Sequence, residues 1–250
     1  MKIDPIHQFN IEPLFTIGHI GNQTIAFTNS SAYMFGTVAI ISLLMIGGVA
    51  GKQLVPGRFQ SMAELSYEFV ANTIRSTAGR EGMKFFPFVF SIFMLIAVSN
   101  IIGIIPYTFT ISSHIIVTAA LALTVFVTVL VYGFYKNGLK FFKLFVPSGV
   151  PVVILPLVVA IEIISFLSRP VSHSVRLFAN MLAGHITLKV FASFITMLGA
   201  FGFVGWFGAL LPLALVVALT ALELLVAFLQ AYVFAILTCI YLNDAIHPGH

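Results

Sequence analysis

Residues 151–197 read PVVILPLVVAIEIISFLSRPVSHSVRLFANMLAGHITLKVFASFITM, and this stretch decides the fold. It is mostly apolar, yet polar and ionisable side chains recur along it. As one helix it would be roughly 70 Å long, since each residue adds about 1.5 Å. The hydrocarbon core of a bilayer is about 30 Å thick, so such a helix must tilt strongly, bend, or both. Pro156 and Pro170 are the places where we expect a bend.

A second overlong apolar segment follows this stretch. The glycine-rich sequence GAFGFVGWFGA at 199–209 separates the two, and the second carries Glu223 and Gln230. We therefore expect residues 151–197 and 205–243 to form a hairpin of two long, strongly tilted membrane helices.

Composition fixes the class of protein. The chain has 250 residues, of which 60% are hydrophobic and 8% are charged. Soluble domains carry about 25% charged residues, so this chain cannot cover a water-facing surface. The net charge of +4 does not indicate nucleic-acid binding, because the charges lie in short loops between apolar runs. The sequence predicts a polytopic membrane protein.

The remaining chain supplies ordinary membrane spans. One amphipathic helix is expected as well, since Met62, Leu65 and Phe69 recur at helical spacing opposite Glu64 and Glu68. We predict an all-α polytopic fold in one membrane domain, 1–250. Its parts before the hairpin are an N-terminal segment (1–32), a transmembrane helix (33–50), the amphipathic surface helix (59–78) and two further transmembrane helices (85–105 and 114–135).

The basic residues predict the orientation. Eight of the twelve Lys and Arg residues follow the spans 33–50 and 114–135, whereas the loop 106–113 has none. Basic loops stay on the cytoplasmic side. We therefore expect an N-terminus outside and a C-terminus in the cytoplasm.

Arg176 is the single residue that points most strongly to a function. An arginine at mid-membrane costs about 2.5–3.5 kcal/mol on insertion scales, and no acidic residue lies within one helical turn of it. Three interpretations stay open: the side chain reaches an interface, lines a wet cavity, or meets a carboxylate from a partner.

Helical geometry sorts the other polar residues. At 100° per residue, Glu162 lies within roughly 40° of the face of Arg176, and Asn180 shares that face. His185 lies roughly 180° away, so one helix presents two polar faces. Two polar sites on opposite faces, displaced along the helix and separated by an arginine, suggest two offset half-channels.

The last helix provides a second set of polar groups. Glu223 and Gln230 share a face, and antiparallel packing would bring Glu223 towards His185. A carboxylate and an imidazole together in a low dielectric are plausible members of a proton relay. The alternative is a buried ion pair that only fixes the hairpin.

No cofactor or metal site is expected. His173 and His185 point roughly 120° apart on one helix, which excludes joint ligation of one haem iron. The histidines and the single cysteine lack metal-ligand spacing. The phosphate-binding pattern GxxxxGK[ST] is absent, so no nucleotide is expected by that route.

Two motifs resemble one family. The run SVRLFANMLAGH (174–185) resembles the signature of the F-type ATP synthase a subunit, and LLVAFLQAYVFAILTCIYL (224–242) resembles its last helix. The sequences IIGIIPYTFTISSH (101–114) and FVPSGVP (145–151) fit as well. The order of His185 before Glu223 looks like the alphaproteobacterial and mitochondrial branch.

The resemblance implies roles for six residues. Arg176 would be the essential arginine that faces the carboxylate of each c subunit, with Asn180 and Gln230 beside it. His185 and Glu223 would line the inlet half-channel, and Glu162 would belong to the outlet half-channel. Protons are preferred over sodium as the ion.

The resemblance also implies partners and a location. The partners would be the c-ring, peripheral-stalk b-type subunits and the lipid bilayer. The location would be the bacterial inner membrane, or alternatively the mitochondrial inner membrane. The chain would be a non-catalytic subunit of a multisubunit enzyme, without an active site of its own.

Two other function classes remain. A secondary transporter or channel acting alone would use Arg176 to bind an anion, but we find no internal repeat of the kind common in transporters. A structural membrane anchor would use Arg176 only as a buried ion pair.

Overall fold

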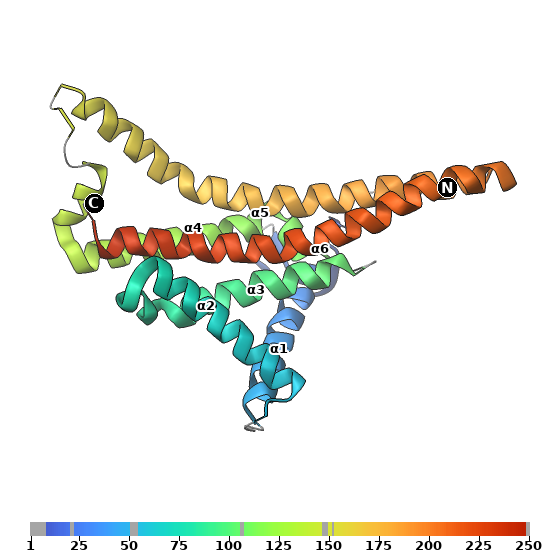
Figure 1. Ribbon diagram of the computed structural model, residues 1–250, viewed down its shortest axis with the longest axis horizontal. Coiled ribbons are helices and arrows are strands. Elements are labelled where there is room, and N and C mark those ends of the chain that lie inside the picture. Colours follow the sequence, from blue (N-terminus) through green and yellow to red (C-terminus); the bar gives the residue numbers. More distant parts are fainter. Residues whose placement is uncertain are drawn as a thin grey trace. The chain divides into compact units, whose positions relative to one another are not determined.

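The computed structural model describes residues 9–20, 23–50, 55–105, 108–146, 150–151 and 153–248 (Figure 1). Within these residues the regular elements are helical, apart from one short β hairpin. In chain order they are β1 (Pro13–Ile20), β2 (Gln23–Thr28), α1 (Asn29–Ala50), α2 (Arg58–Gly82), η2 (Met83–Phe85), α3 (Phe86–Ile104), η3 (Ile111–Ser113), α4 (Ile115–Asn137), η4 (Gly138–Phe145), α5 (Leu155–Gly199) and α6 (Phe203–Ile246).

The expected class, an all-α polytopic membrane protein, is confirmed. Five helical stretches in the described part of the chain are long and apolar enough to cross a membrane. Parts of the expected loop 106–113 and of the motif 145–151 lie outside the described residues, as do residues 1–8.

The last two helices are far longer than an upright span. α5 has 45 residues and α6 has 44. Each is therefore about 66 Å long, more than twice the hydrocarbon thickness of about 30 Å. Only residues 200–202 separate them, and Gly202 supports this abrupt reversal with a φ of 74°, which glycine adopts without strain. Pro170 lies inside α5 and Pro212 inside α6, so each helix lacks one internal backbone hydrogen bond.

The chain divides into two compact units, and the first comprises residues 1–42, 95–114 and 177–230. Its antiparallel β1–β2 hairpin was not predicted from the sequence. Asn29 joins this N-terminal region to the start of α1: its side-chain oxygen accepts from the Glu12 N–H at 3.2 Å, and its amide donates to the Asn10 carbonyl at 3.0 Å.

The second unit comprises residues 43–94, 115–176 and 231–250. In its helix α2, Met62 and Leu65 of the expected apolar face are 53% and 66% exposed. Val70, Ala71 and Ile74 are each 1% exposed, whereas Glu68 and Arg75 are exposed. One side of α2 is therefore packed inside the unit, whereas its charged residues and these two apolar residues are open.

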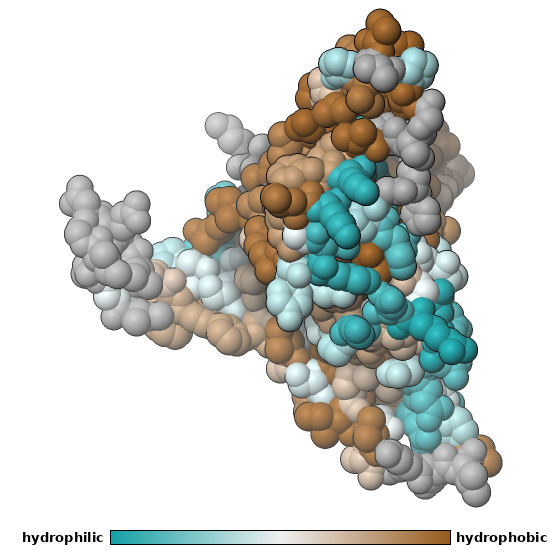
Figure 2. All heavy atoms as spheres, turned by 90° about the vertical axis from the view of Figure 1, so that its left-hand side faces the viewer, coloured by the Kyte–Doolittle hydropathy of each residue, from teal (hydrophilic) through white to brown (hydrophobic). Residues whose placement is uncertain are grey.

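The charged end of the second unit lies where α2 and α4 finish. Lys136 of α4 forms an ion pair with Glu81 of α2, and hydrogen bonding to this ammonium together with its charge holds the pKa of Glu81 below its ordinary value. Figure 2 faces this end and shows hydrophilic side chains gathered beside hydrophobic ones. The exposed basic residues here are Arg80, Lys84, Lys136, Lys140 and Lys143.

Candidate functional site

A buried acid–imidazole pair lies in the first unit. His185 of α5 and Glu223 of α6 are 7% and 5% exposed, and 3.2 Å separates His185 Nδ1 from Glu223 Oε1. The hairpin brings these residues together although 38 positions separate them in sequence (223 − 185). The antiparallel packing considered from the sequence therefore places them side by side.

Gly184 makes this close approach possible. A Cβ atom at this position would lie 2.8 Å from Glu223 Oε1 and 3.3 Å from Glu223 Cδ. Real side-chain carbons do not come this close to a neighbouring oxygen without displacing it. The absence of a side chain at 184 is therefore what admits the Glu223 carboxylate against the backbone of α5.

Thr110 extends the pair on the other side of the imidazole. Its Oγ1 lies 3.0 Å from His185 Nε2, and its side chain is 1% exposed. Thr110 comes from the segment between α3 and α4 and was not predicted as a site residue. Its atoms also approach Gly103 of α3, where a Cβ would come within 2.8 Å of the Thr110 methyl carbon. The three polar groups Thr110, His185 and Glu223 thus form a continuous buried row.

A second buried polar cluster lies in the same unit. Ser112 Oγ donates to Asn100 Oδ1 at 2.6 Å, and Asn100 Nδ2 donates to the Ala227 carbonyl at 3.4 Å. Asn100 is 0% exposed and Ser112 is 4% exposed. Sequence reasoning missed this cluster. A lone asparagine inside the apolar run of α3 was the available signal, because polar side chains are rare in membrane helices without a role.

One aromatic residue of the N-terminal segment, Phe9, lies beside the imidazole. The Phe9 ring centroid is 6.3 Å from that of His185, and Lys189 Nζ lies 5.7 Å from the Phe9 ring centroid. Phe9 is itself 9% exposed. The N-terminal segment therefore contributes to the low-dielectric surroundings of His185.

The Glu223 carboxylate has an unusual hydrogen-bond status. Neither of its oxygens accepts a hydrogen bond from a described residue, because the 3.2 Å approach of His185 lacks hydrogen-bond geometry. A buried carboxylate without donors is costly unless a proton or a water molecule joins it. The site is therefore chemically suited to taking up and releasing a proton.

Arg176 and Asn180 lie on the open face of α5. Both are exposed, whereas Leu177 and Met181 on the opposite face are 1% and 0% exposed. Their neighbours on the open face include Ser172 and the exposed Ala183, which are small. This side of the helix presents a cation surrounded by side chains that allow another helix to come close.

The remaining predicted residues occupy separate positions. Glu162 is half-buried near the start of α5, and Gln230 is 8% exposed on α6. Among the described residues, Arg176, Glu162, Asn180 and Gln230 form no side-chain hydrogen bond or ion pair. Of the six predicted site residues, the structure joins His185 to Glu223 and leaves the other four without such a contact in the described chain.

Arg169, which shares the face of Arg176, has a partner. Its Nη1 lies 2.7 Å from Asp244 Oδ2, and its guanidinium carbon lies 5.2 Å from the ring centre of Phe166 and 4.8 Å from that of Tyr241. These contacts lie within the second unit and tie the first half of α5 to the end of α6. The charge of Arg169 is therefore paired within this chain, and the residue holds the two helices together.

No metal centre is formed by the described residues, since no three His, Cys, Asp or Glu side chains among them converge.

Comparisons with known proteins match nearly the whole chain to one family. The family model described as ATP synthase A chain matches residues 31–243. ATP synthase subunit a of Nitrobacter winogradskyi is 84% identical over 248 residues, which cover 99% of this chain and 100% of that protein. The protein of the same name from Rhodopseudomonas palustris strain TIE-1 is 80% identical over 250 residues, the full length of both. The matched region runs from α1 to α6 and contains all six predicted site residues.

Proposed function

Since this chain belongs to the ATP synthase subunit a family and so to the proton-translocating membrane sector of that enzyme, we propose that protons cross it through two offset half-channels facing a rotating c-ring. The family is the one that the two hairpin motifs indicated. The described helices and the bacterial relatives make the chain a multi-pass protein of a bacterial plasma membrane.

One observation carries the proposed inlet half-channel. His185 and Glu223 are buried together, and both oxygens of Glu223 lack a donor in the described chain. A purely structural ion pair is expected to satisfy its carboxylate with hydrogen bonds, because an unsatisfied buried charge destabilises the fold. A carboxylate left with free lone pairs instead favours transient protonation. Thr110 and His185 would pass the proton along the buried row to Glu223.

Arg176 is proposed to separate the two half-channels. An uncompensated guanidinium in a membrane helix costs about 2.5–3.5 kcal/mol, and Arg176 forms no ion pair with a described residue. A carboxylate on a passing c subunit would supply the missing partner. The positive charge would favour release of the proton from that carboxylate and would repel a proton moving directly between the half-channels.

The other residues complete the proposed path. Glu162, 14 positions before Arg176 on α5, would line the outlet half-channel. Asn180 and Gln230 would provide polar contacts beside the arginine. The N-terminus would lie outside and the C-terminus in the cytoplasm, with b-type subunits of the peripheral stalk as further partners.

The test is ATP-driven acidification of inverted membrane vesicles that contain the complete enzyme with Arg176→Ala. We expect acidification to vanish while assembly and ATP hydrolysis are retained. Glu223→Gln should also abolish acidification, because the amide cannot carry the proton. Arg58→Ala, which removes an exposed arginine from α2, is the control and should behave as the unmodified enzyme. Acidification near the control level with Arg176→Ala would show that the arginine is structural and that the proposed mechanism is wrong.

A further inference from the structure

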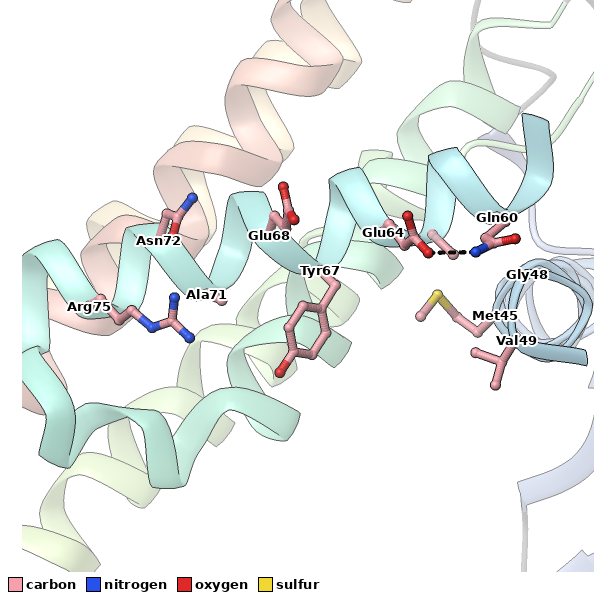
Figure 3. Close-up of a pocket in the computed structure, with 11 residues that line it drawn as sticks. Met45, Gly48, Val49, Gln60, Glu64, Tyr67, Glu68, Ala71, Asn72 and Arg75 are labelled. Carbon is pink, nitrogen blue, oxygen red and sulfur yellow. Dashed lines mark hydrogen bonds between the residues drawn. The ribbon is translucent and has the colours of Figure 1, made fainter. Parts of the chain in front are cut away.

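We propose that a cavity between α1 and α2 binds the headgroup of a zwitterionic aminophospholipid, of which phosphatidylethanolamine is the simplest example. The cavity has a volume of about 660 Å³ and is drawn in Figure 3. Its lining residues all belong to the second unit. The proposal is independent of the proton path, because none of the residues assigned to that path lines the cavity.

Small residues create the floor of the cavity. Gly48 of α1 and Ala63 of α2 are buried, and a Cβ added to Gly48 would lie 2.7 Å from the Cβ of Ala63. The two helices therefore touch at this point. Ala71, two turns further along α2, is also buried and lines the cavity. Beyond the contact point the short side chain of Ala71 leaves the depression open.

The walls carry charges of both signs. Glu68 and Tyr67 point to opposite sides of α2 (Figure 3), and Arg75, seven residues after Glu68, lies on nearly the same face of the helix as Glu64 and Glu68. Glu64 accepts a hydrogen bond from Gln60 at 2.8 Å. Neither Glu68 nor Arg75 forms an ion pair with a described residue. The cavity therefore offers a cation and carboxylates that the described chain itself does not neutralise.

This charge pattern matches a zwitterion. A phosphodiester accepts charge-assisted hydrogen bonds from a guanidinium, and a primary ammonium donates them to carboxylates. Tyr67, which is 46% exposed, offers a hydroxyl donor for the phosphate and a ring face for the ammonium. A purely anionic headgroup would satisfy Arg75 but would stand against the negative charges of Glu64 and Glu68.

The surroundings of the cavity suit acyl chains. Val49 of α1, which lines the cavity, is 54% exposed, and Ile46 in the preceding turn of α1 is 67% exposed. An amphipathic helix in the plane of the interface places its polar groups at headgroup level and its apolar edge beside the acyl chains. A lipid bound here would therefore contact the charged wall with its headgroup and these exposed side chains with its tails. This combination favours a lipid over a soluble ligand.

The experiment uses the complete, assembled enzyme in vesicles of phosphatidylglycerol that contain a trace of photoactivatable phosphatidylethanolamine. After irradiation, labelled peptides of α1 and α2 are quantified by mass spectrometry. Arg75→Gln and Glu68→Gln should each lower labelling at the cavity by roughly tenfold, the effect of losing one charge-assisted hydrogen bond. Arg58→Gln changes charge on the same helix outside the cavity and should leave labelling unchanged. Tyr67→Phe, the mildest change, should lower labelling less than Arg75→Gln.

Competition in the unmodified enzyme completes the test without any substitution. Unlabelled phosphatidylethanolamine should displace the label, whereas phosphatidic acid, which lacks the ammonium, should not. Equal displacement by phosphatidic acid would overturn recognition of the ammonium, and displacement by inorganic phosphate would show a free-anion site. Labelling unaffected by Arg75→Gln and Glu68→Gln, or absent because another subunit fills the cavity, would also overturn the proposal.

Discussion

At the scale of single residues, Glu223 shows how the fold positions a carboxylate without neutralising it. Gly184 admits the carboxylate against α5, and His185 faces it at 3.2 Å without hydrogen-bond geometry. A small change at this contact should move the carboxylate without removing any titratable group. Function should therefore depend on a residue that carries no chemistry of its own.

Gly184→Ala tests this dependence. The added methyl group would lie 2.8 Å from Glu223 Oε1, and overpacking of this kind costs about 1–3 kcal/mol. We expect ATP-driven acidification by inverted vesicles to fall by roughly tenfold, which corresponds to about 1.4 kcal/mol lost from the productive position of the carboxylate. Gly199→Ala is the matched control on the same helix, since a Cβ there meets nothing within 4 Å. Equal rates for the two variants would contradict the packing argument.

The sequence predicted part of this site. Helical geometry and an antiparallel hairpin were enough to place Glu223 near His185, because both lie on regular helices whose faces can be counted. Thr110 escaped prediction because it lies in an irregular segment, where spacing says nothing about direction. Asn100 was missed although it interrupts an apolar run, because its partner Ser112 comes from a neighbouring loop.

At the scale of elements, an ion pair in the second unit holds α6 against α5. Arg169 pairs with Asp244 at 2.7 Å, and the side chains are 22% and 26% exposed. Tyr241 lies within cation–π distance of the same guanidinium. This contact fixes the end of α6 against the first half of α5.

Removal of one partner should weaken the hairpin. Arg169→Leu or Asp244→Leu alone should cost about 1.5–3 kcal/mol, because a partly buried charge loses its hydrogen bond. The double variant should cost less than the sum, since no charge is left unpaired. Release of this subunit from the heated complex gives the measurement. Additive effects of the two substitutions would argue against a direct pair.

At the scale of the whole molecule, hydropathy and length predicted most of the fold. Runs of about 20 apolar residues are long enough to span a bilayer, and the overlong α5 and α6 were recognisable for the same reason. The β1–β2 hairpin was not, because its strands have only weak alternation of apolar and polar residues. Its register depends on tertiary contacts such as those of Asn29, which one segment of sequence does not reveal.

The proposed orientation of the chain in the membrane can be tested by cysteine labelling. Asn10→Cys should react with a membrane-impermeant maleimide added to intact cells with a permeabilised outer membrane, and Lys140→Cys should react only in inverted vesicles. Both positions are exposed, and the native Cys239 is 0% exposed, so its background labelling should be low. Reaction of Lys140→Cys in intact cells, and of Asn10→Cys only in inverted vesicles, would contradict the predicted topology.

The short turn between α5 and α6 also limits how the gene can change in length. The number of residues between Phe203, where α6 begins, and Glu223 sets the direction in which the Glu223 side chain leaves the helix. One inserted residue between them would rotate the carboxylate by about 100° away from His185. Insertions and deletions in this hairpin are therefore tolerable only as compensated pairs or near whole turns. The number of residues between the turn and Glu223 should therefore stay nearly constant among descendants, even where side chains along the helices change.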